Sequence, residues 1–193
     1  MQILKQTWSA TAMLLLLTVI TGILYPVAVT GIATLLFPHQ SKGSLIVKDG
    51  KTQGSELLGQ QFSEPRYFWG RLSATGPFPY NSASSSGSNL GPLNPAVQTA
   101  AEARAAELRK YDPGMKEIPV DLLTSSGSGL DPHISPAAAA VQVKRVAQER
   151  SLSLEKVQDL VAKHTAARQL GILGEPRVNV LLLNRELDSL HAK

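Results

Sequence analysis

The sequence contains no cysteine among its 193 residues. This absence excludes disulfide bonds, thiolate metal sites and a lipid-modified cysteine anchor. It is compatible with either side of a membrane, because a domain without disulfides needs only a sufficient hydrophobic core. The part of the chain after residue 37 is long enough for one compact domain with such a core.

Motifs of common enzyme classes are also missing. There is no glycine-rich lysine loop for phosphates, no paired histidines at metal-ligand spacing and no Rossmann glycine fingerprint. Residues 153–156 read SLEK, the S-x-x-K spacing of penicillin-binding serine enzymes, but the companion S-D-N and K-T-G elements are absent. Residues 131–133, DPH, are more typical of a turn than of a metal site. No catalytic or metal-binding residue is assigned.

Nucleic acid is excluded as a partner, although the chain is basic. The isoelectric point is about 9.4 and the formal net charge is +4. The basic residues are dispersed along the chain, whereas nucleic-acid binding requires them to gather on one face.

Charged residues are absent from residues 10–37, where most side chains are apolar. This run exceeds the roughly 20 residues that cross a bilayer, so the helix must tilt, kink or protrude, and Pro26 and Gly31 suit a kink. The apolar part of a cleaved signal peptide is typically only about 7–15 residues long. The sequence therefore predicts a retained membrane span, preceded by a short segment at residues 1–9.

Small or hydroxylated residues recur every four positions within the span. They form one ridge on a helix otherwise covered in branched aliphatic side chains, and they are Thr18, Gly22, Pro26, Thr30 and Thr34. Such a ridge lets another helix approach closely, so we expect it to pack against partner helices in the membrane. Thr and Gly are also simply tolerated in lipid, which is the alternative interpretation.

The flanking charges leave the orientation of the span open. Lys5 precedes it, whereas Lys42, Lys48 and Lys51 follow it, and by count this favours a cytoplasmic C-terminus. A long domain is translocated largely regardless of such charges, so the count does not decide.

The remainder, residues 38–193, is predicted to form one small α/β (α+β) domain. Residues 44–48 favour a strand, and Asp49-Gly50 is a dipeptide of tight hairpin turns. Residues 178–183, VNVLLL, are typical of a buried strand, and residues 184–190 of a short terminal helix or turn. Strands at both ends with helices between them indicate one layered domain.

Three helices are predicted between these strands, at residues 95–110, 136–150 and 154–170, the last stopped by Gly171. The third has the clearest apolar stripe, and His164 on that stripe is expected to be a hydrogen-bonded core histidine.

Six of the ten aromatic residues lie in the Pro/Gly-rich residues 62–80. They either pack the core or line a contact surface, since Tyr and Trp combine apolar area with a polar tip. Core packing is the favoured interpretation. Arg66 and Arg71 flank the cluster and can stack on it or pair with acids of a partner.

An eight-residue pattern occurs twice. Residues 85–92 read SSGSNLGP and residues 125–132 read SSGSGLDP, so six of eight positions agree. Each copy leads to a capping residue before a proline, Asn94-Pro95 and Ser135-Pro136, which is typical of a helix start. Biased loop composition also produces chance matches.

The order of these features resembles the C subunit of the Kdp-type potassium-transporting ATPase. The resemblance covers nearly the whole chain, from one span through YFWGR, SSGSNLGPLNP, SGSGLDPHISP and QVKRVA to VNVLLLN. Its most specific pieces are residues 67–71, 85–95, 126–136 and 178–184.

The resemblance implies a non-catalytic accessory subunit of a high-affinity potassium pump in the cytoplasmic (inner) membrane. Its partners would be a P-type ATPase subunit, a channel-like potassium-binding subunit and a very small extra subunit. The N-terminus would be cytoplasmic and the domain extracytoplasmic, over the side from which potassium enters. Potassium would be the ion transported by the complex, and no cofactor would be bound firmly.

The family is also described as a catalytic chaperone that raises the ATP affinity of the hydrolysing subunit, through a glutamine that matches Gln142 here. A solvent-facing glutamine in a helix is the ordinary alternative, and an effect from the potassium side on ATP affinity would be indirect. The expected partner contacts are the aromatic segment and the repeated loops, with the candidates Tyr67, Phe68, Trp69, Arg71, Ser86, Asn89, Ser126, Asp131 and His133.

Two other classes of function stay open at this point. A free-standing, membrane-anchored binding or sensor module would use the repeated loops as a small-ligand site. A serine-dependent enzyme of the cell envelope would react with a serine probe at Ser153 or at a loop serine.

Overall fold

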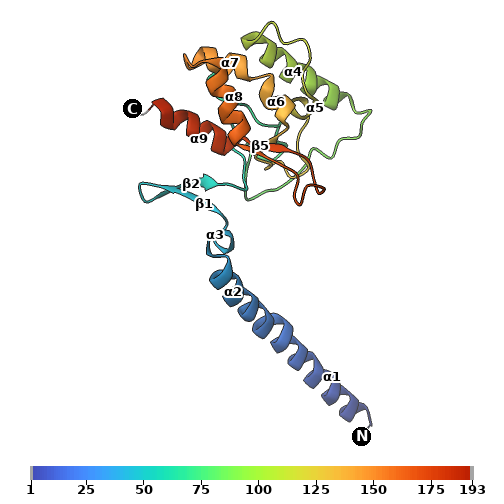
Figure 1. Ribbon diagram of the computed structural model, residues 1–193. Coiled ribbons are helices and arrows are strands. Elements are labelled where there is room, and N and C mark those ends of the chain that lie inside the picture. The colour runs from blue at the N-terminus through green and yellow to red at the C-terminus, as the bar shows by residue number, and fades with distance from the viewer. Residues whose placement is uncertain (1, 192–193) are drawn as a thin grey trace. The chain divides into compact units, whose positions relative to one another are not determined.

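The computed structural model describes residues 2–191, which divide into two compact units, one up to Gln53 and one from Gly54 onward. Figure 1 labels the helices and strands of both units. The first unit contains an apolar helix and the second contains the small mixed domain. This confirms the predicted fold class.

The first unit contains one helix long and apolar enough to cross a membrane, Gln2–Leu36. It consists of α1 (Gln2–Val19), a π-helical turn η1 (Ile20–Leu24) and α2 (Tyr25–Leu36). Proline lacks an N–H and its ring crowds the preceding turn, so the wide turn lies where Pro26 disturbs the regular helical hydrogen bonds. A short helix, α3 (Pro38–Ser41), follows.

The predicted hairpin is present as a two-stranded sheet of β1 (Leu45–Lys48) and β2 (Lys51–Ser55). Both turn residues have positive φ, 53° at Asp49 and 73° at Gly50. A two-residue hairpin turn of this type requires that conformation, which Asp and Gly adopt readily. The prediction from this dipeptide is confirmed.

The second unit contains a three-stranded antiparallel sheet in the order β3-β5-β4. The strands are β3 (His133–Ile134), β4 (Thr165–Ala166) and β5 (Arg177–Asn179). In the central strand, Val178 pairs with Ile134 on one side and with Thr165 on the other.

The first predicted helix is confirmed as α4 (Pro95–Tyr111). Its cap is also as expected, because the side chain of Asn94 accepts a hydrogen bond from the backbone N–H of Ala96 at 3.0 Å. A one-turn helix, α5 (Val120–Leu123), packs against α4.

The second predicted helix is wrong as a continuous element. It is split into α6 (Pro136–Ala140) and α7 (Val143–Glu149) by a turn at Val141 and Gln142. Gln142 directs its side-chain amide into the core, where it bonds to the backbone of Trp69. The break lies at the residue that supplies this amide, and the alanine-rich sequence gives no local sign of it.

The third predicted helix, α8 (Leu154–Lys163), is shorter than expected and does not end at Gly171. Thr165 and Ala166 form β4 instead, so backbone pairing with β5 replaces the helical bonds. His164 follows the helix and is partly buried, with its Nε2 2.5 Å from Oε2 of Glu186. It is hydrogen-bonded as predicted, at the margin of the core.

The predicted strand at 178–183 is wrong beyond Asn179. The chain turns into α9 (Val180–His191), and Oδ1 of Asn179 accepts the N–H of Leu182 at 3.1 Å. The first turn of α9 is buried on several faces, so its sequence has no polar side to show a helical period. The predicted terminal helix is the second half of α9.

The helices supply most of the core of the second unit. α6 and α9 pack against β5, while α8 packs against α6 and α7, as the crowded helices around β5 in Figure 1 illustrate. Fully buried side chains of this core include Phe68, Trp69, Leu108, Leu122, Val146, Val157, Val178, Leu183 and Leu187. Two of these come from an irregular segment, which is the first part of the candidate site.

Candidate functional site

The aromatic segment enters the core as an irregular strap, residues 65–70 (PRYFWG), which belongs to no helix or strand. It begins in a turn, in which the N–H of Tyr67 donates to the carbonyl of Glu64 at 3.1 Å. Its buried peptide groups need hydrogen-bond partners. Two amides, called here the clamp amides, each pair with both backbone groups of one residue. Asn184 bonds to N–H and C=O of Phe68 at 2.8 and 2.9 Å, and Gln142 bonds to those of Trp69 at 2.8 and 3.1 Å.

Arginines from the helices hold the other carbonyl groups of the strap. Arg145 donates to the carbonyls of Pro65 and Tyr67, Arg150 donates to that of Arg66, and Arg104 to that of Gly70. These side chains supply the hydrogen-bond partners that a helix or sheet would otherwise provide. The aromatic side chains of the strap are thereby fixed, although no regular backbone pairing holds them.

Gln142 lies inside the core and is not exposed to solvent. Its side chain is fully buried, its Oε1 also accepts from Arg145 at 2.6 Å, and its Nε2 also donates to the carbonyl of Ala138 at 3.0 Å. All hydrogen-bonding capacity of the amide is therefore in use. The solvent-facing glutamine considered from the sequence is wrong, and a nucleotide has no direct access to this group.

Phe68 and Trp69 are likewise corrected as contact candidates. Both are fully buried, so the core interpretation of these two aromatic residues is confirmed and they present no surface to a partner. Tyr67 remains partly exposed, with its hydroxyl group donating to Asp188 at 3.1 Å and the guanidinium groups of Arg66 and Arg150 near its ring.

The two serine-glycine repeats lie side by side. The N–H of Ser86 and the hydroxyl group of Ser85 both donate to the carbonyl of Ser128, at 2.9 and 3.1 Å. A β-carbon at Gly87 would lie 2.9 Å from the carbonyl oxygen of Gly127, so the loops touch through bare backbone. The repeats touch at these glycines, and a hollow of about 430 Å³ beside them is lined by Ser88, Leu90 and Pro92 of the first repeat and by Ser125 of the second.

The repeats also share a backbone conformation where their sequences differ. Asn89 and Gly129 occupy equivalent positions, and their φ angles are 52° and 68°. Gly and Asn are the residues that most readily adopt this left-handed conformation. The two repeats therefore keep the same backbone conformation although one has Asn and the other Gly at this position. This supports the repeat as a structural unit.

Tyr80 fixes the segment that runs between the strap and the first repeat. Its hydroxyl group donates to the carbonyl of Arg71 at 2.7 Å, and its ring lies where a β-carbon of Gly59 would be. Burial is the main cause that raises the pKa of Tyr80 to about 12, so the hydroxyl group keeps its proton at neutral pH. Ser73 adds a bond to the carbonyl of Gly129 at 2.6 Å.

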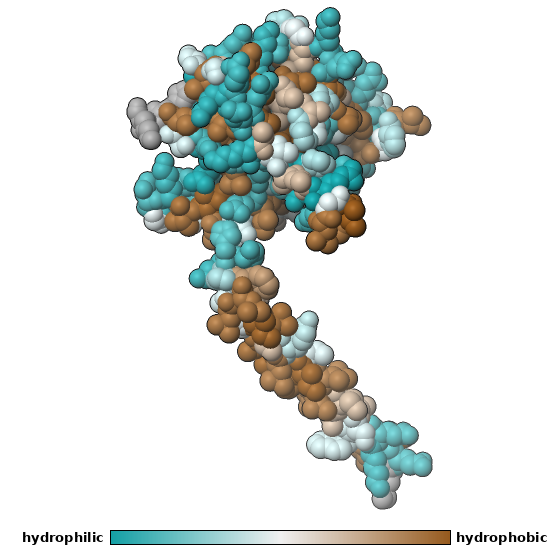
Figure 2. All heavy atoms as spheres, in the orientation of Figure 1, coloured by the Kyte–Doolittle hydropathy of each residue, from teal (hydrophilic) through white to brown (hydrophobic). Residues whose placement is uncertain are grey.

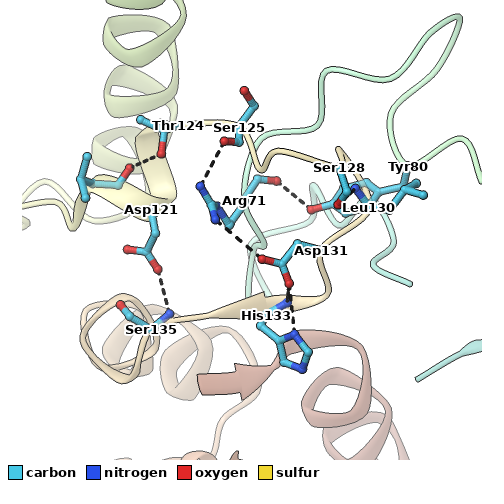
Figure 3. A network of polar contacts seen from close by, with 11 residues as sticks. Arg71, Tyr80, Asp121, Thr124, Ser125, Ser128, Leu130, Asp131, His133 and Ser135 are labelled. Atoms are coloured by element: carbon cyan, nitrogen blue, oxygen red, sulfur yellow. Dashed lines mark hydrogen bonds and ion pairs between the residues drawn. The ribbon is translucent and has the colours of Figure 1, made fainter. Parts of the chain in front are cut away.

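Arg71 joins this segment to the second repeat (Figure 3). Its guanidinium group donates to the carbonyl of Ser125 at 3.0 Å and lies 3.7 Å from a carboxylate oxygen of Asp131. Asp131 in turn accepts from the backbone N–H and from Nδ1 of His133, at 3.0 and 3.1 Å. The DPH motif is therefore a turn, as favoured from the sequence.

The electrostatics of Asp131 follow from these neighbours. Burial by itself would raise its pKa, but the hydrogen bonds from His133 and the positive charge of Arg71 outweigh burial and lower the pKa. Among the residues that the structure describes, no group of three or more His, Asp or Glu side chains is placed to hold a metal ion. The carboxylate is an ion-pair partner in this arrangement.

An open hollow of about 620 Å³ lies beside this network. Its wall combines positive and negative side chains, with Arg71 and Arg177 on one hand and Asp121, Asp131 and Glu175 on the other, together with His133. Such a lining suits the polar rim of a protein interface better than an apolar ligand.

The contact candidates thus separate into two groups. Arg71, Ser86, Asp131 and His133 are partly exposed around the paired repeats, and Asn89 is fully on the surface. Ser126 is buried, because its backbone bonds to Leu72 and Gly129. The structure brings the exposed candidates other than Tyr67 into one region of the domain, which we call the loop face: the paired repeats together with Arg71, Asp131 and His133. Tyr67 contacts Asp188 and Arg150 instead.

Sequence reasoning missed the polar residues that hold the strap, namely Arg104, Arg145, Arg150 and Asn184. Buried arginines and amides are uncommon, and in sequence they look like ordinary polar helix positions. The hydroxyl group of Ser153 caps α8 by accepting the N–H of Lys156 at 3.2 Å.

The ion pair of Asp131 should make stability depend on pH. Because the folded pKa is lowered, its contribution is present above the ordinary carboxyl value of about 3.9 and is lost as the pH falls through the folded pKa. We expect Asp131→Asn to cost less than about 1 kcal/mol at pH 7, since the group is partly exposed. The variant should lose less stability than the parent between pH 6 and pH 3. Equal acid sensitivity of parent and Asp131→Asn would contradict the assignment.

The sequence was compared with protein families and with curated proteins, and both comparisons match most of the chain. The profile of the KdpC family, described as K+-transporting ATPase, c chain, matches residues 7–189. The Potassium-transporting ATPase KdpC subunit of Methylococcus capsulatus is 62% identical over 182 residues, which cover 94% of this chain and 96% of that protein. The subunits of the same name from Dechloromonas aromatica and Herpetosiphon aurantiacus are 60% and 59% identical, and each match covers 94% of this chain and 95% and 94% of those proteins.

Proposed function

The chain belongs to the KdpC family, the c chain of K+-transporting ATPases, and from this membership we propose that it is a non-catalytic accessory subunit of a potassium pump. It acts by binding. The observation that carries this proposal is that its conspicuous polar residues hold its own backbone: Gln142 clamps the strap, Ser153 caps a helix and Asp131 closes a turn.

The partners in this proposal are a P-type ATPase subunit that hydrolyses ATP, a channel-like potassium-binding subunit and a very small extra subunit. The N-terminus lies in the cytoplasm and the mixed domain lies outside the cytoplasmic membrane, on the side from which potassium enters. The loop face contacts the partners there, because it combines positive and negative side chains and its backbone is held rigidly by the paired repeats.

The membrane helix supplies the second contact. In a regular α-helix, a ridge with four-residue spacing drifts by about 160° between Thr18 and Thr34. The π turn η1 holds about one extra residue, which turns the following part back by about 100° and leaves about 60°. The wide turn therefore straightens the ridge and keeps Thr18, Gly22, Pro26, Thr30 and Thr34 near one face.

The hydroxyl group of Thr34 is satisfied within the helix, since it donates to the carbonyl of Thr30 at 2.7 Å. At Thr34 the ridge therefore needs no hydrogen bond from a partner. Close packing of backbones is the contact that it favours.

Regulation follows from unequal binding to two states of the pump. An accessory subunit that binds one conformation more tightly shifts the populations by its differential affinity, and so changes the apparent affinity for ATP or potassium without touching either ligand. The buried Gln142 supports an indirect effect on ATP affinity over a direct contact.

Co-purification tests the proposal. The chain is tagged at its C-terminus, native membranes of potassium-starved cells are solubilised in mild detergent, and stoichiometric partners are identified by mass spectrometry. A P-type ATPase and a large polytopic potassium subunit are expected. Thr18→Leu with Gly22→Leu should reduce this recovery at least tenfold, because bulky side chains separate the helices.

The control for that variant is Val19→Leu with Ile23→Leu, which has the same spacing on a neighbouring face and nearly conserves volume. Unchanged recovery of the partner subunits with Thr18→Leu and Gly22→Leu would contradict the proposed packing of the ridge against partner helices. Recovery of the unaltered chain alone would favour a free-standing anchored module over the accessory subunit.

A further inference from the structure

The connection between β4 and β5 exposes three large aliphatic side chains at its tip. Leu170, Ile172 and Leu173 are 88%, 74% and 54% exposed. In Figure 2, brown side chains protrude from the domain at the place where Figure 1 draws the connection that leads into β5. Neighbouring aliphatic residues gathered on an exposed loop mark an interaction site more often than scattered ones do.

This tip is held in a defined conformation. The backbones of Gln169 and Leu173 exchange two hydrogen bonds of 2.9 Å, and the ion pair of Arg168 with Glu175, at 2.6 Å, closes the neck below them. Leu170 has a φ of 54°, a left-handed conformation that is unfavourable for a leucine. The chain thus presents these side chains rigidly, and at an energetic cost.

The neck of the tip continues the loop face. Glu175, Pro176 and Arg177 line the same hollow as Arg71, Asp131 and His133. A partner that covers the loop face therefore meets the base of the tip as well. The apolar tip and the polar hollow can contact one surface together, with apolar anchors beside a polar rim.

A lipid bilayer and a second copy of this chain are less suitable binding partners for the tip. Segments that insert into lipid are rich in Trp, Lys and Arg, whereas residues 169–174 contain none of these and Arg168 is paired with Glu175. A second copy of this chain would need a specific interface of about 1,200 Å² or more, far above what three side chains can bury.

We propose that the tip at residues 170–173 docks into an apolar socket on another subunit of the potassium-transporting complex, an inference that rests on the proposed function. The contact is small, but the membrane helix already keeps the domain beside its partners. Such tethering replaces free concentration by a high effective concentration, so a few buried side chains suffice to fix the domain. Pre-organisation of the tip lowers the cost of binding further.

Photo-crosslinking in native membranes tests the occupant. A photoreactive phenylalanine analogue replaces Ile172 in the tagged full chain, and the same analogue at the exposed Leu154 in α8 is the control. After irradiation we expect position 172 to give an adduct with another subunit of the complex, at least fivefold more abundant than any adduct at position 154. An adduct only with lipid, an adduct only with a second copy of this chain, or no adduct above the control overturns the proposal.

Retention of the chain in the complex is the second measurement. Leu170→Asn with Ile172→Asn should dissociate from the detergent-solubilised complex at least tenfold faster than the parent, because both substitutions remove apolar surface that the socket would bury. Asparagine tolerates the backbone at position 170, so folding should be preserved. The control is Leu154→Asn.

These results distinguish the two proposals. If the unaltered chain brings down no transport subunits, the accessory function itself fails. If the complex is recovered with the unaltered chain but the tip variant dissociates at the parental rate, only the docking of the tip is overturned.

Discussion

Replacing Trp69 with alanine is expected to destabilise the domain by roughly 3–5 kcal/mol, the range for removing a large aromatic side chain from a core. The side chain is fully buried, and its indole N–H donates to the carbonyl of Glu64 at 3.0 Å. The ring of Tyr111 meets the indole edge to face at 5.7 Å. Since domains are stable by only about 5–15 kcal/mol, this variant should be close to unfolding.

Two buried arginines also lie over the indole ring. The guanidinium carbons of Arg104 and Arg145 lie 4.8 and 4.5 Å from its ring. Burial, followed by the charge of Arg104, lowers the pKa of Arg145 to about 10, so this group stays charged at pH 7. Removal of the ring leaves two like charges without the aromatic faces that partly compensate their burial, which places the expected loss at the upper end of the range.

The other tryptophan provides a matched control. Trp8 lies in α1 and is exposed, so Trp8→Phe leaves Trp69 as the only indole to report on the domain. Urea unfolding of the full chain in mild detergent, followed by the fluorescence of Trp69 and by circular dichroism, gives the reference. Trp69→Ala is then followed by circular dichroism. A loss below about 1 kcal/mol would contradict the arrangement described.

Gln142→Leu should be almost as harmful, with a loss of roughly 2–4 kcal/mol. Leucine has a similar size, but it leaves the N–H and C=O of Trp69 buried without partners and removes one acceptor of Arg145. Each unsatisfied buried group costs about 1–3 kcal/mol. The matched variant is Asn184→Leu, which removes the other clamp amide and should give a comparable loss.

The pair of clamp variants also separates structure from nucleotide binding. With either variant assembled into the pump at low temperature, the apparent ATP affinity should change in proportion to the fraction of folded accessory subunit. Both variants should therefore give the same relation between stability and ATP affinity. A loss of ATP affinity with Gln142→Leu alone, at unchanged stability, would support a direct contact between Gln142 and the nucleotide.

Local patterns in the sequence predicted the parts of the fold that local chemistry determines. The uncharged run, the Asp49-Gly50 turn and the cap at Asn94 each act through neighbouring residues, and the structure contains the apolar helix, the hairpin and α4. The break at Gln142 and the helical conformation of 180–183 depend on distant partners. A continuous apolar run in particular has no period that distinguishes a buried strand from a buried helix.

The candidate site divides in the same way. The repeats and the DPH turn were recognisable because their residues are close in sequence. The strap was recognised as aromatic, but its clamp was not, since Phe68 and Asn184 are 116 positions apart. The exposed tip was overlooked because an aliphatic residue in sequence is normally assigned to the core.

The distance between the strap and its clamp has a consequence for the order of folding. Synthesis proceeds from the N-terminus, so the strap is made 73 positions before Gln142 and 116 positions before Asn184. Until α9 has been made, the peptide groups of Phe68 lack their native partners and both aromatic side chains lack their complete core. Contacts at such separations also form slowly. The domain is therefore expected to close in one late step, when its last helix arrives.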